Sequence, residues 1–442
     1  MPNTATALAP DLATQSLAEA VRALTPYMVE TLSGFVAAKS PSGAEQPAVD
    51  FLEGALRDLG LTSEHIMLNT AQLKDLPLFS TPCCPDGGRY NLLATHRPRE
   101  RGGRSVLFNG HLDVVPTGPD AMWAESPFKA YVEDGWLFGR GAGDMKAGIV
   151  CALAAFKALK NLGVQPAGNV GFNAVLEEES TGNGALATVA ALRNAVGAGK
   201  LASFDTVLIP EPLGESLMTA QMGVFWMFVD LTGRPAHAAY MTTGVSPVEA
   251  GIAVMADLRE LEAEWNLPRN RPAAYREHAH PINFNLGQIH GGEWNSSVPC
   301  TCTLGIRIGF YPHMDVNEAK AIVAQRVRDT LARLGSTLQL EIRYEGFHAP
   351  GCEFDLDNAP MRALAEAHRK VHGSEVARTA TTATTDARHF RITLDTPVTC
   401  YGPEARNIHG IDESVSIDSM VRVTTTFAQF LVDWCGVEPA VD

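Results

Sequence analysis

A histidine and two aspartates with metal-binding potential lie in residues 108–148, which begin FNGHLDVVP and end GRGAGDMKAG. His111 and Asp113 are two residues apart, so they point to the same side of an extended backbone. The histidine can bind a metal through one ring nitrogen while Asp113 binds the other nitrogen and fixes the tautomer. Asp144 lies in a glycine-rich turn that allows tight backbone packing, and its carboxylate can bridge two cations. We interpret these residues as the first half of a two-metal site.

Each of these features alone also has an ordinary structural explanation. A histidine in an HxD pattern can be a hydrogen-bonded core residue or part of a turn. Asp144 can simply cap the helix that is expected to begin near Lys146. The metal hypothesis therefore depends on further ligands elsewhere in the chain.

Three adjacent glutamates, Glu177, Glu178 and Glu179, follow the apolar run VGFNAVL and precede the turn STGNG. Adjacent negative charges repel one another, so at the end of a buried run they indicate a site more than they would on a surface helix. One glutamate can bind a cation while its neighbour takes a proton from water. Glu211 lies between two prolines in LIPEP, which hold it rigid, and an ordinary turn residue is the alternative interpretation.

Two later histidines are further candidates. His409 lies in the glycine-bearing loop ARNIHGIDES, where a surface histidine is the alternative interpretation. His237 lies in GRPAHAAY, too far along the chain for local reasoning to place it at the metals. The other histidines show no ligand pattern and are interpreted as structural or surface residues.

Short apolar strands alternate with helices in the first half of the chain. This alternation predicts an α/β fold with a mixed, mainly parallel sheet covered by helices. His111, the glutamate triplet and Glu211 each follow a predicted strand, and ligands gather beyond the carboxyl ends of strands in such sheets. Several independent candidates therefore fall where a site is expected. The strands are predicted at residues 105–108, 169–176 and 205–209, and the helices at residues 146–162 and 184–194.

A smaller inserted domain is expected at residues 222–346, where the order of elements becomes βαββαβ. This order is the ferredoxin-like arrangement. The catalytic, metal-binding domain then comprises residues 1–221 and 347–442. Helices are also predicted at residues 17–38, 46–59 and 419–434, and residues 69–88 are predicted to form a loop near the site.

The composition narrows the class of protein. The chain has 442 residues, 45% of them hydrophobic, which suggests more than one domain. The 35 basic and 50 acidic residues give a net charge of −15, which disfavours nucleic acid or an anionic membrane as partner. The eight cysteines form no CxxC pair, as is typical of reduced thiols in a cytosolic protein. The N-terminus has no secretory-signal pattern and no run is apolar enough to span a membrane, so a cytoplasmic location is expected.

Seven motifs together carry a resemblance that covers nearly the whole chain. The chain resembles the di-zinc amidohydrolase and peptidase family of acetylornithine deacetylase, succinyl-diaminopimelate desuccinylase, aminoacylase and bacterial glutamate carboxypeptidase. The motifs stand in the family's order: GHLDVVP, GRGAGDMKAG, EEESTGNG, the EP of LIPEP, GRPAH, TDAR and GPEARNIHGIDE.

The resemblance implies a role for each metal-site candidate. One cation takes His111 and Glu211, the other takes Glu179 and His409, and Asp144 bridges them. The two divalent ions are expected to be zinc, with cobalt or manganese as alternatives. Asp113 is expected to orient His111. Glu178 is expected to be the general base, and the family also has a cis peptide at the position of Asp144–Met145.

The resemblance also implies substrate contacts from the inserted domain, which serves as lid and dimerisation domain in the family. His237 is expected to donate to the oxyanion, usually in the other subunit of a homodimer. Arg307, in TLGIRIGF, matches an arginine that binds a substrate carboxylate. In the lid motif Ser296 stands where the family often has asparagine, and Asn295 is one residue earlier. Glu177 also departs from the family, which usually has aspartate at that position.

The resulting hypothesis is a metal-dependent hydrolase that cleaves the amide bond of an N-acyl amino acid or a related N-acyl or N-formyl compound. Metal-activated water and the general base Glu178 perform the reaction. EEESTGNGAL is most similar to the deacetylase-like branch of the family. The alternatives are a dipeptidase or carboxypeptidase on the same scaffold, and a non-catalytic binding protein. The loops at residues 69–88 and 294–297 are expected to decide the substrate.

Overall fold

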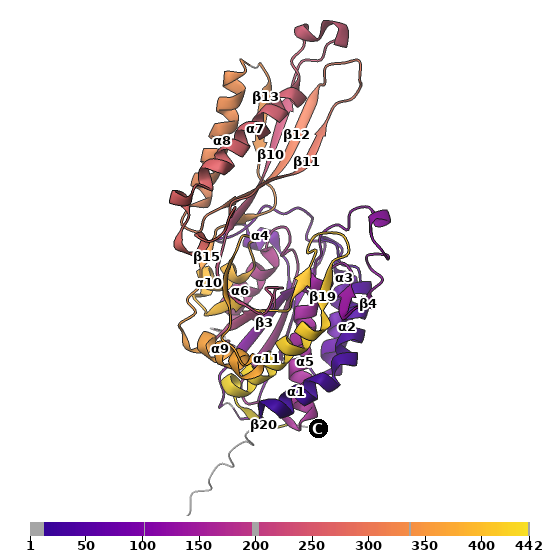
Figure 1. Cartoon of the computed structure of the whole chain (residues 1–442), viewed down its shortest axis with the longest axis vertical. Coiled ribbons are helices and arrows are strands. Elements are labelled where there is room, and N and C mark those ends of the chain that lie inside the picture. The colour runs from indigo at the N-terminus through magenta and orange to yellow at the C-terminus, as the bar shows by residue number, and fades with distance from the viewer. Residues whose placement is uncertain (1–12, 101, 197–202, 336, 441–442) are drawn as a thin grey trace, which may run out of the picture.

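The chain folds into two units that lie end to end along the long axis of the molecule (Figure 1). A computed structural model describes residues 13–100, 102–196, 203–335 and 337–440. Residues 1–12, which make up most of the N-terminal stretch without a secretory-signal pattern, lie outside these described residues. None of the helices within the described ranges combines the length and the apolar character needed to cross a bilayer. All eight cysteines are free.

The larger unit is built on a sheet of six strands, most of them parallel. β3 is parallel to β7 and β8, and β17 is parallel to β8, whereas β2 is antiparallel to β7 and β1 is antiparallel to β2. This confirms the predicted α/β class with a mixed, mainly parallel sheet. In spatial order the strands are β1 (Ser63–Met67), β2 (Tyr90–His96), β7 (Val170–Val175), β3 (Val106–His111), β8 (Val207–Ile209) and β17 (Val398–Cys400).

Helices cover both faces of this sheet, and for that reason every residue of β3 and β7 is buried. α5 (Ala147–Asn161) connects β3 to β7, and α6 (Asn183–Val196) connects β7 to β8 in the opposite direction along the sheet. Because such crossovers are right-handed, the two helices lie on opposite faces. The other helices of this unit are α1 (Thr14–Ala23), α2 (Thr25–Ala37), α3 (Gln46–Asp58), α4 (Thr70–Leu73), α9 (Ala359–His372), α10 (Ala387–Leu394) and α11 (Ile417–Phe430).

Three small sheets flank the large one and complete the unit. The first contains β15 (Cys352–Glu353), β9 (Leu217–Gln221) and β16 (Arg378–Thr381). The second contains β18 (Ala405–Arg406), β19 (Ser414–Ser416), β5 (Trp136–Phe138) and β4 (Tyr131–Glu133). The third pairs β20 (Val437–Pro439) with β6 (Val164–Pro166).

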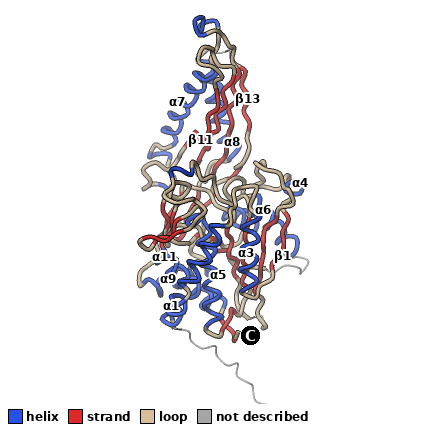
Figure 2. The backbone as a smooth tube through the Cα atoms, turned by 90° about the vertical axis from the view of Figure 1, so that its right-hand side faces the viewer, coloured by secondary structure: helices blue, strands red, loops and turns tan. Residues whose placement is uncertain are grey.

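The smaller unit has its own sheet and its own apolar core. Its elements follow in the order β10 (Gly223–Thr232), α7 (Pro247–Trp265), β11 (Phe284–Gly291), β12 (Thr301–Phe310), α8 (Val316–Arg333) and β13 (Gln339–Arg343). The antiparallel strands lie in the order β11-β12-β10-β13, and β14 (His348–Ala349) pairs with β10 as the chain returns. Figure 2 shows this narrow sheet with its helices alongside. The division at residues 222 and 346, and the role of the unit as a lid, stay predictions.

The structure differs from the sequence-based expectation at several elements. The single helix expected at residues 17–38 is two helices, α1 and α2, which meet at Leu24. Pro26 lies in the first turn of α2, where its missing N–H costs no helical hydrogen bond, so a new helix begins there. The strands β1 and β2 were not anticipated; β1 is a mostly exposed edge strand and lacks a continuous apolar run.

A stacked histidine pair, of which His368 is buried and His372 partly buried, packs α9 against the region around Tyr401. The rings of His368 and His372 stack with centroids 3.8 Å apart. His368 Nδ1 lies 2.7 Å from the Tyr401 hydroxyl, and His372 Nδ1 lies 3.3 Å from a Glu215 carboxylate oxygen. Burial, together with the charge of His372, lowers the pKa of His368 to about 4.

This lowered pKa predicts a loss of stability in acid. An unfolded histidine binds a proton near pH 6.5, whereas His368 in the folded chain binds one only near pH 4. The stabilisation is therefore complete above the unfolded pKa and is lost as the pH falls through this window. Between pH 7 and 4.5, we expect the free energy of unfolding to fall by about 2 kcal/mol more for the wild type than for His368→Gln. Urea unfolding at both pH values measures this difference, and equal losses in the two proteins would contradict it.

Candidate metal centre

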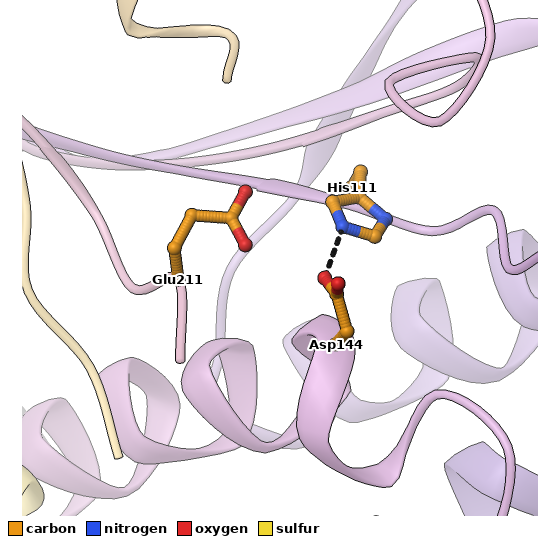
Figure 3. A group of neighbouring side chains, drawn as sticks. All are labelled: His111, Asp144 and Glu211. Carbon is orange, nitrogen blue, oxygen red and sulfur yellow. Dashed lines mark hydrogen bonds and ion pairs between the residues drawn. The ribbon is translucent and has the colours of Figure 1, made fainter. Parts of the chain in front are cut away.

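Five side chains from separate segments meet beyond the carboxyl end of β3 and form two groups of potential ligands. The first group is His111, Asp144 and Glu211, shown in Figure 3. The second group is Asp144, Glu179 and His409. Within each group the ligand atoms all lie within 4.8 Å of one another. The sequence-based candidates are thus brought together, with Asp144 common to both groups.

The two oxygens of Asp144 face two different imidazoles. Asp144 Oδ1 lies 3.0 Å from His111 Nε2, and Oδ2 lies 3.4 Å from His409 Nε2. His409 Nε2 also lies 3.0 Å from Glu179 Oε1. A carboxylate with one oxygen on each side has the arrangement that a bridge between two cations requires.

Asp113 supports the site in a different way from the one expected. The sequence suggested that its carboxylate binds the imidazole of His111, but the carboxylate lies 3.9 Å away. His111 Nδ1 instead lies 2.8 Å from the backbone carbonyl oxygen of Asp113. The carboxylate of Asp113 accepts the backbone N–H groups of Glu178 at 3.1 Å and Glu179 at 3.2 Å. Asp113 therefore orients His111 through its main chain and holds the glutamate turn through its side chain.

A buried ion pair fixes the turn that carries Asp144. Glu413 accepts the backbone N–H groups of Gly143 at 2.9 Å and Asp144 at 3.0 Å, and its other oxygen pairs with Arg140. Arg140 also donates to the carbonyl of Gly410, next to His409, at 3.0 Å. The pair thus joins the bridging acid to the loop of His409. The peptide bond Asp144–Met145 is cis, as the family resemblance implied.

The electrostatics of the centre favour a cation. Burial raises the pKa of Glu211, and the nearby charge of Asp144 raises it further. Burial alone would lower the pKa of His409, but hydrogen bonds to Asp144 and Glu179 raise it to about 11. Burial by itself would also lower the pKa of His111, but the hydrogen bond to Asp144 and the charges of the surrounding carboxylates together raise it well above its usual value. Carboxylates this crowded attract positive charge, and the nitrogen and oxygen donors suit divalent transition metals.

Glu178 lies beside the ligands without belonging to either group. It is only 5% exposed, and its Oε1 makes no hydrogen bond within the described structure. Burial, followed by the charge of Asp386, raises its pKa well above the usual range. A buried carboxylate with a free oxygen can accept a proton from a molecule bound at the centre.

The predicted substrate-binding residues of the smaller unit are not joined to this centre by any hydrogen bond or ion pair of the described residues. His237 is exposed, and its Nδ1 accepts the backbone N–H of Ala239 at 3.0 Å. Asn295 and Ser296 are exposed. Arg307 is partly buried and donates to the carbonyl of Thr382 at 3.4 Å. The roles of these four residues stay predictions.

Sequence reasoning assigned no role to several residues that support the site. Arg140 and Glu413 both lie within the quoted motifs. The motifs therefore marked these two residues, but they did not indicate that the residues form an ion pair that supports the site. Asp386, in TDAR, is fully buried close to Glu178, and burial raises its pKa to about 6. Arg89, described below, lies in no motif.

Comparison with known proteins identifies the family to which this centre belongs. The model of peptidase family M20/M25/M40 matches residues 107–433, which include all five candidate ligands. The chain belongs to the M20 peptidase family. As an M20 protein, it is a hydrolase of the metallopeptidase and amidohydrolase type.

Individual relatives have low sequence identity to this M20 chain, but their alignments cover most of both chains. It is 28% identical over 359 residues to the N-formyl-4-amino-5-aminomethyl-2-methylpyrimidine deformylase of Bacillus subtilis, covering 75% of this chain and 80% of the relative. It is 27% identical over 402 residues to the succinyl-diaminopimelate desuccinylase of Maricaulis maris, and the alignment covers 89% of this chain and 92% of the relative. Human carnosine dipeptidase 1 has the same fold, with a TM-score of 0.78 at 18% identity, covering 97% of this chain and 100% of that one.

Proposed function

We propose that the chain removes an acyl or formyl group from the nitrogen of an N-acyl amino acid or a related small molecule. The observation that carries this proposal is the free, buried oxygen of Glu178 beside two ligand groups that share Asp144. The names of the deformylase and the desuccinylase support it, because the first describes removal of an N-formyl group and the second removal of a succinyl group.

The ligand set fits two divalent cations, for which we propose zinc, with cobalt or manganese as alternatives. His111 and Glu211 would hold one ion, Glu179 and His409 the other, and Asp144 both. When bound, the ions supply Lewis acidity toward the scissile carbonyl and toward the attacking water.

The remaining steps belong to side chains of the protein. Glu178 takes a proton from the attacking water and passes it to the leaving amine nitrogen. Asp113 keeps Glu178 in place through the backbone N–H bond at 3.1 Å.

The smaller unit would complete the site by closing over the substrate. Arg307 would bind a substrate carboxylate with its planar pair of donors, and Asn295 and Ser296 would contact the substrate from their loop. His237 would donate to the oxyanion in the site of the other subunit. Exposed apolar side chains near His237, on β11 and in the loop after β11 support a homodimer formed through this unit: Tyr240, Met241, Ile289 and Trp294.

A panel of small amides tests this function. The metal-loaded protein is given N-formyl, N-acetyl and N-succinyl amino acids and unmodified dipeptides, and release of the free amine is measured. We expect kcat/KM to be at least about tenfold higher for the best N-acyl amino acid than for any dipeptide, which is about 1.4 kcal/mol of transition-state binding. The carboxamide of the best substrate is the matched control, and it should be poorer because it lacks the charge that Arg307 binds.

Two other results of this panel would contradict the proposal. Preferred cleavage of dipeptides would favour a dipeptidase or carboxypeptidase. Failure to release an amine from any compound, by a protein that holds its metals, would favour a non-catalytic binding protein.

A further inference from the structure

We infer that Arg89 and Glu177 are positioning residues that set the backbone of the Glu178–Glu179 turn and thereby control one of the two cation sites selectively. The inference rests on the proposed function, in which Glu178 carries the proton and Glu179 is a metal ligand. Neither Arg89 nor Glu177 belongs to a ligand group.

Glu177 has a backbone conformation that needs support. Its φ is +62°, in the left-handed region that residues other than glycine rarely adopt. Its carbonyl accepts the backbone N–H groups of Thr181 at 2.9 Å and Gly182 at 2.7 Å, which closes a tight turn around Glu178 and Glu179. The geometry of the two functional glutamates therefore depends on how firmly Glu177 is held.

The side chain of Glu177 is held on both oxygens. It is fully buried, and its Oε1 accepts a hydrogen bond from the Arg89 guanidinium and another from the Cys84 thiol at 3.3 Å. Its Oε2 accepts the hydroxyl of Thr181 at 2.7 Å. An aspartate here would withdraw the carboxylate by about 1.5 Å, one carbon–carbon bond. The longer glutamate in this chain is thus matched to Arg89.

Arg89 anchors the turn to a different part of the fold. Its second guanidinium nitrogen donates to Glu45 Oε1 at 3.0 Å, and Glu45 precedes α3. The same oxygen of Glu45 accepts the backbone N–H of Gly43 at 2.7 Å. The side chain of Arg89 is only 11% exposed and those of its two partners are buried. Loss of the arginine would leave two buried carboxylates unpaired, which is strongly unfavourable.

The two cation sites depend on this anchor unequally. Glu179 lies in the second ligand group with Asp144 and His409, so a shift of the turn moves a ligand of that group. In the first group, His111 is the last residue of β3 and Glu211 follows β8, which is a separate strand. The turn reaches the first group only indirectly, because Asp113 accepts the N–H groups of the turn through its carboxylate and contacts His111 through its main-chain carbonyl. A displaced turn should therefore weaken the second site much more than the first.

The test compares full-length Arg89→Lys with the wild type by calorimetric titration of the metal-free proteins with Zn²⁺. Lysine keeps the charge but cannot bind both glutamates through a planar fork. We expect one of the two sites to weaken about 10- to 100-fold, as when other supports of metal ligands are removed, and the other site to change less than about twofold. The kcat should fall with the KM unchanged, because Glu178 moves with the turn.

The matched control is Arg326→Lys on α8, whose arginine also has two acidic partners, Asp257 at 3.3 Å and Glu264 at 2.7 Å. Both sites should keep their affinities in this variant. The charge-neutral double variant Arg89→Gln/Glu177→Gln provides a second route if Arg89→Lys folds poorly, and it should show the same selective loss.

Hydrogen–deuterium exchange of the metal-free proteins gives an independent readout. Arg89→Lys should speed exchange of the amides in residues 177–182 and leave those of residues 142–146 unchanged. Equal weakening of both cation sites, or unchanged exchange at residues 177–182, would overturn the inference. A wild-type protein that cleaves no amide would instead overturn the proposed function. The exchange measurement would still test whether Arg89 holds the turn, because it does not depend on activity.

Discussion

Replacing Glu178 by glutamine should lower kcat by about 10²- to 10⁴-fold, the usual contribution of a general acid–base residue, while both cations stay bound. Glutamine has nearly the same shape but cannot accept the proton of the attacking water. Glu178 belongs to neither ligand group, and one of its carboxylate oxygens is buried without a partner, so the change to glutamine removes no ligand from either cation.

Steady-state kinetics and elemental analysis of the same preparation measure this result. The matched control is Glu19→Gln, an exposed residue of α1 that should keep the wild-type kcat. A Glu178→Gln protein with its full metal content and normal turnover would exclude Glu178 as the proton carrier.

Replacing Asp144 by alanine should remove both cations and all activity. This aspartate is the one member common to both ligand groups, and each of its oxygens faces a different imidazole. Glu211→Ala and Glu179→Ala should each weaken only one site, because each residue belongs to a single group. The comparison therefore separates a bridging ligand from a terminal one.

Metal content after gel filtration in metal-free buffer distinguishes these variants. Asp144→Asn serves as a second variant that keeps the shape of the side chain, and circular dichroism checks that each protein is folded. An Asp144→Ala protein that is folded and retains two tightly bound cations would contradict the bridging role.

Local sequence was sufficient to place three parts of this site. His111, the glutamate triplet and Glu211 each come at or just after the end of a short apolar strand, and the carboxyl ends of parallel strands meet at one edge of the sheet. The location of each candidate at the end of a predicted strand was therefore enough to place it at this edge of the sheet. His409 had no such local signal, because its loop is held by contacts of Arg140 that are distant in sequence, and only the family resemblance selected it.

The supporting interactions were harder to predict, for two physical reasons. An HxD pattern cannot reveal whether the aspartate contacts the imidazole through its carboxylate or its main chain, and Asp113 uses the main chain. Buried ion pairs join residues that are far apart: Arg89 is 44 residues from Glu45 and 88 from Glu177. No periodic pattern connects such positions, so these contacts become visible only in the folded chain.

A crystal structure of the zinc-loaded protein, with anomalous scattering measured at the zinc edge, tests the two-metal centre most directly. The expected result is two peaks about 3.5–4 Å apart on either side of Asp144, the usual spacing in two-metal sites. One peak should lie at bonding distance from His111 and Glu211, and the other from Glu179 and His409. The two-metal centre would be contradicted if zinc bound elsewhere, or if His409 and Glu211 lay far from any peak beside Asp144.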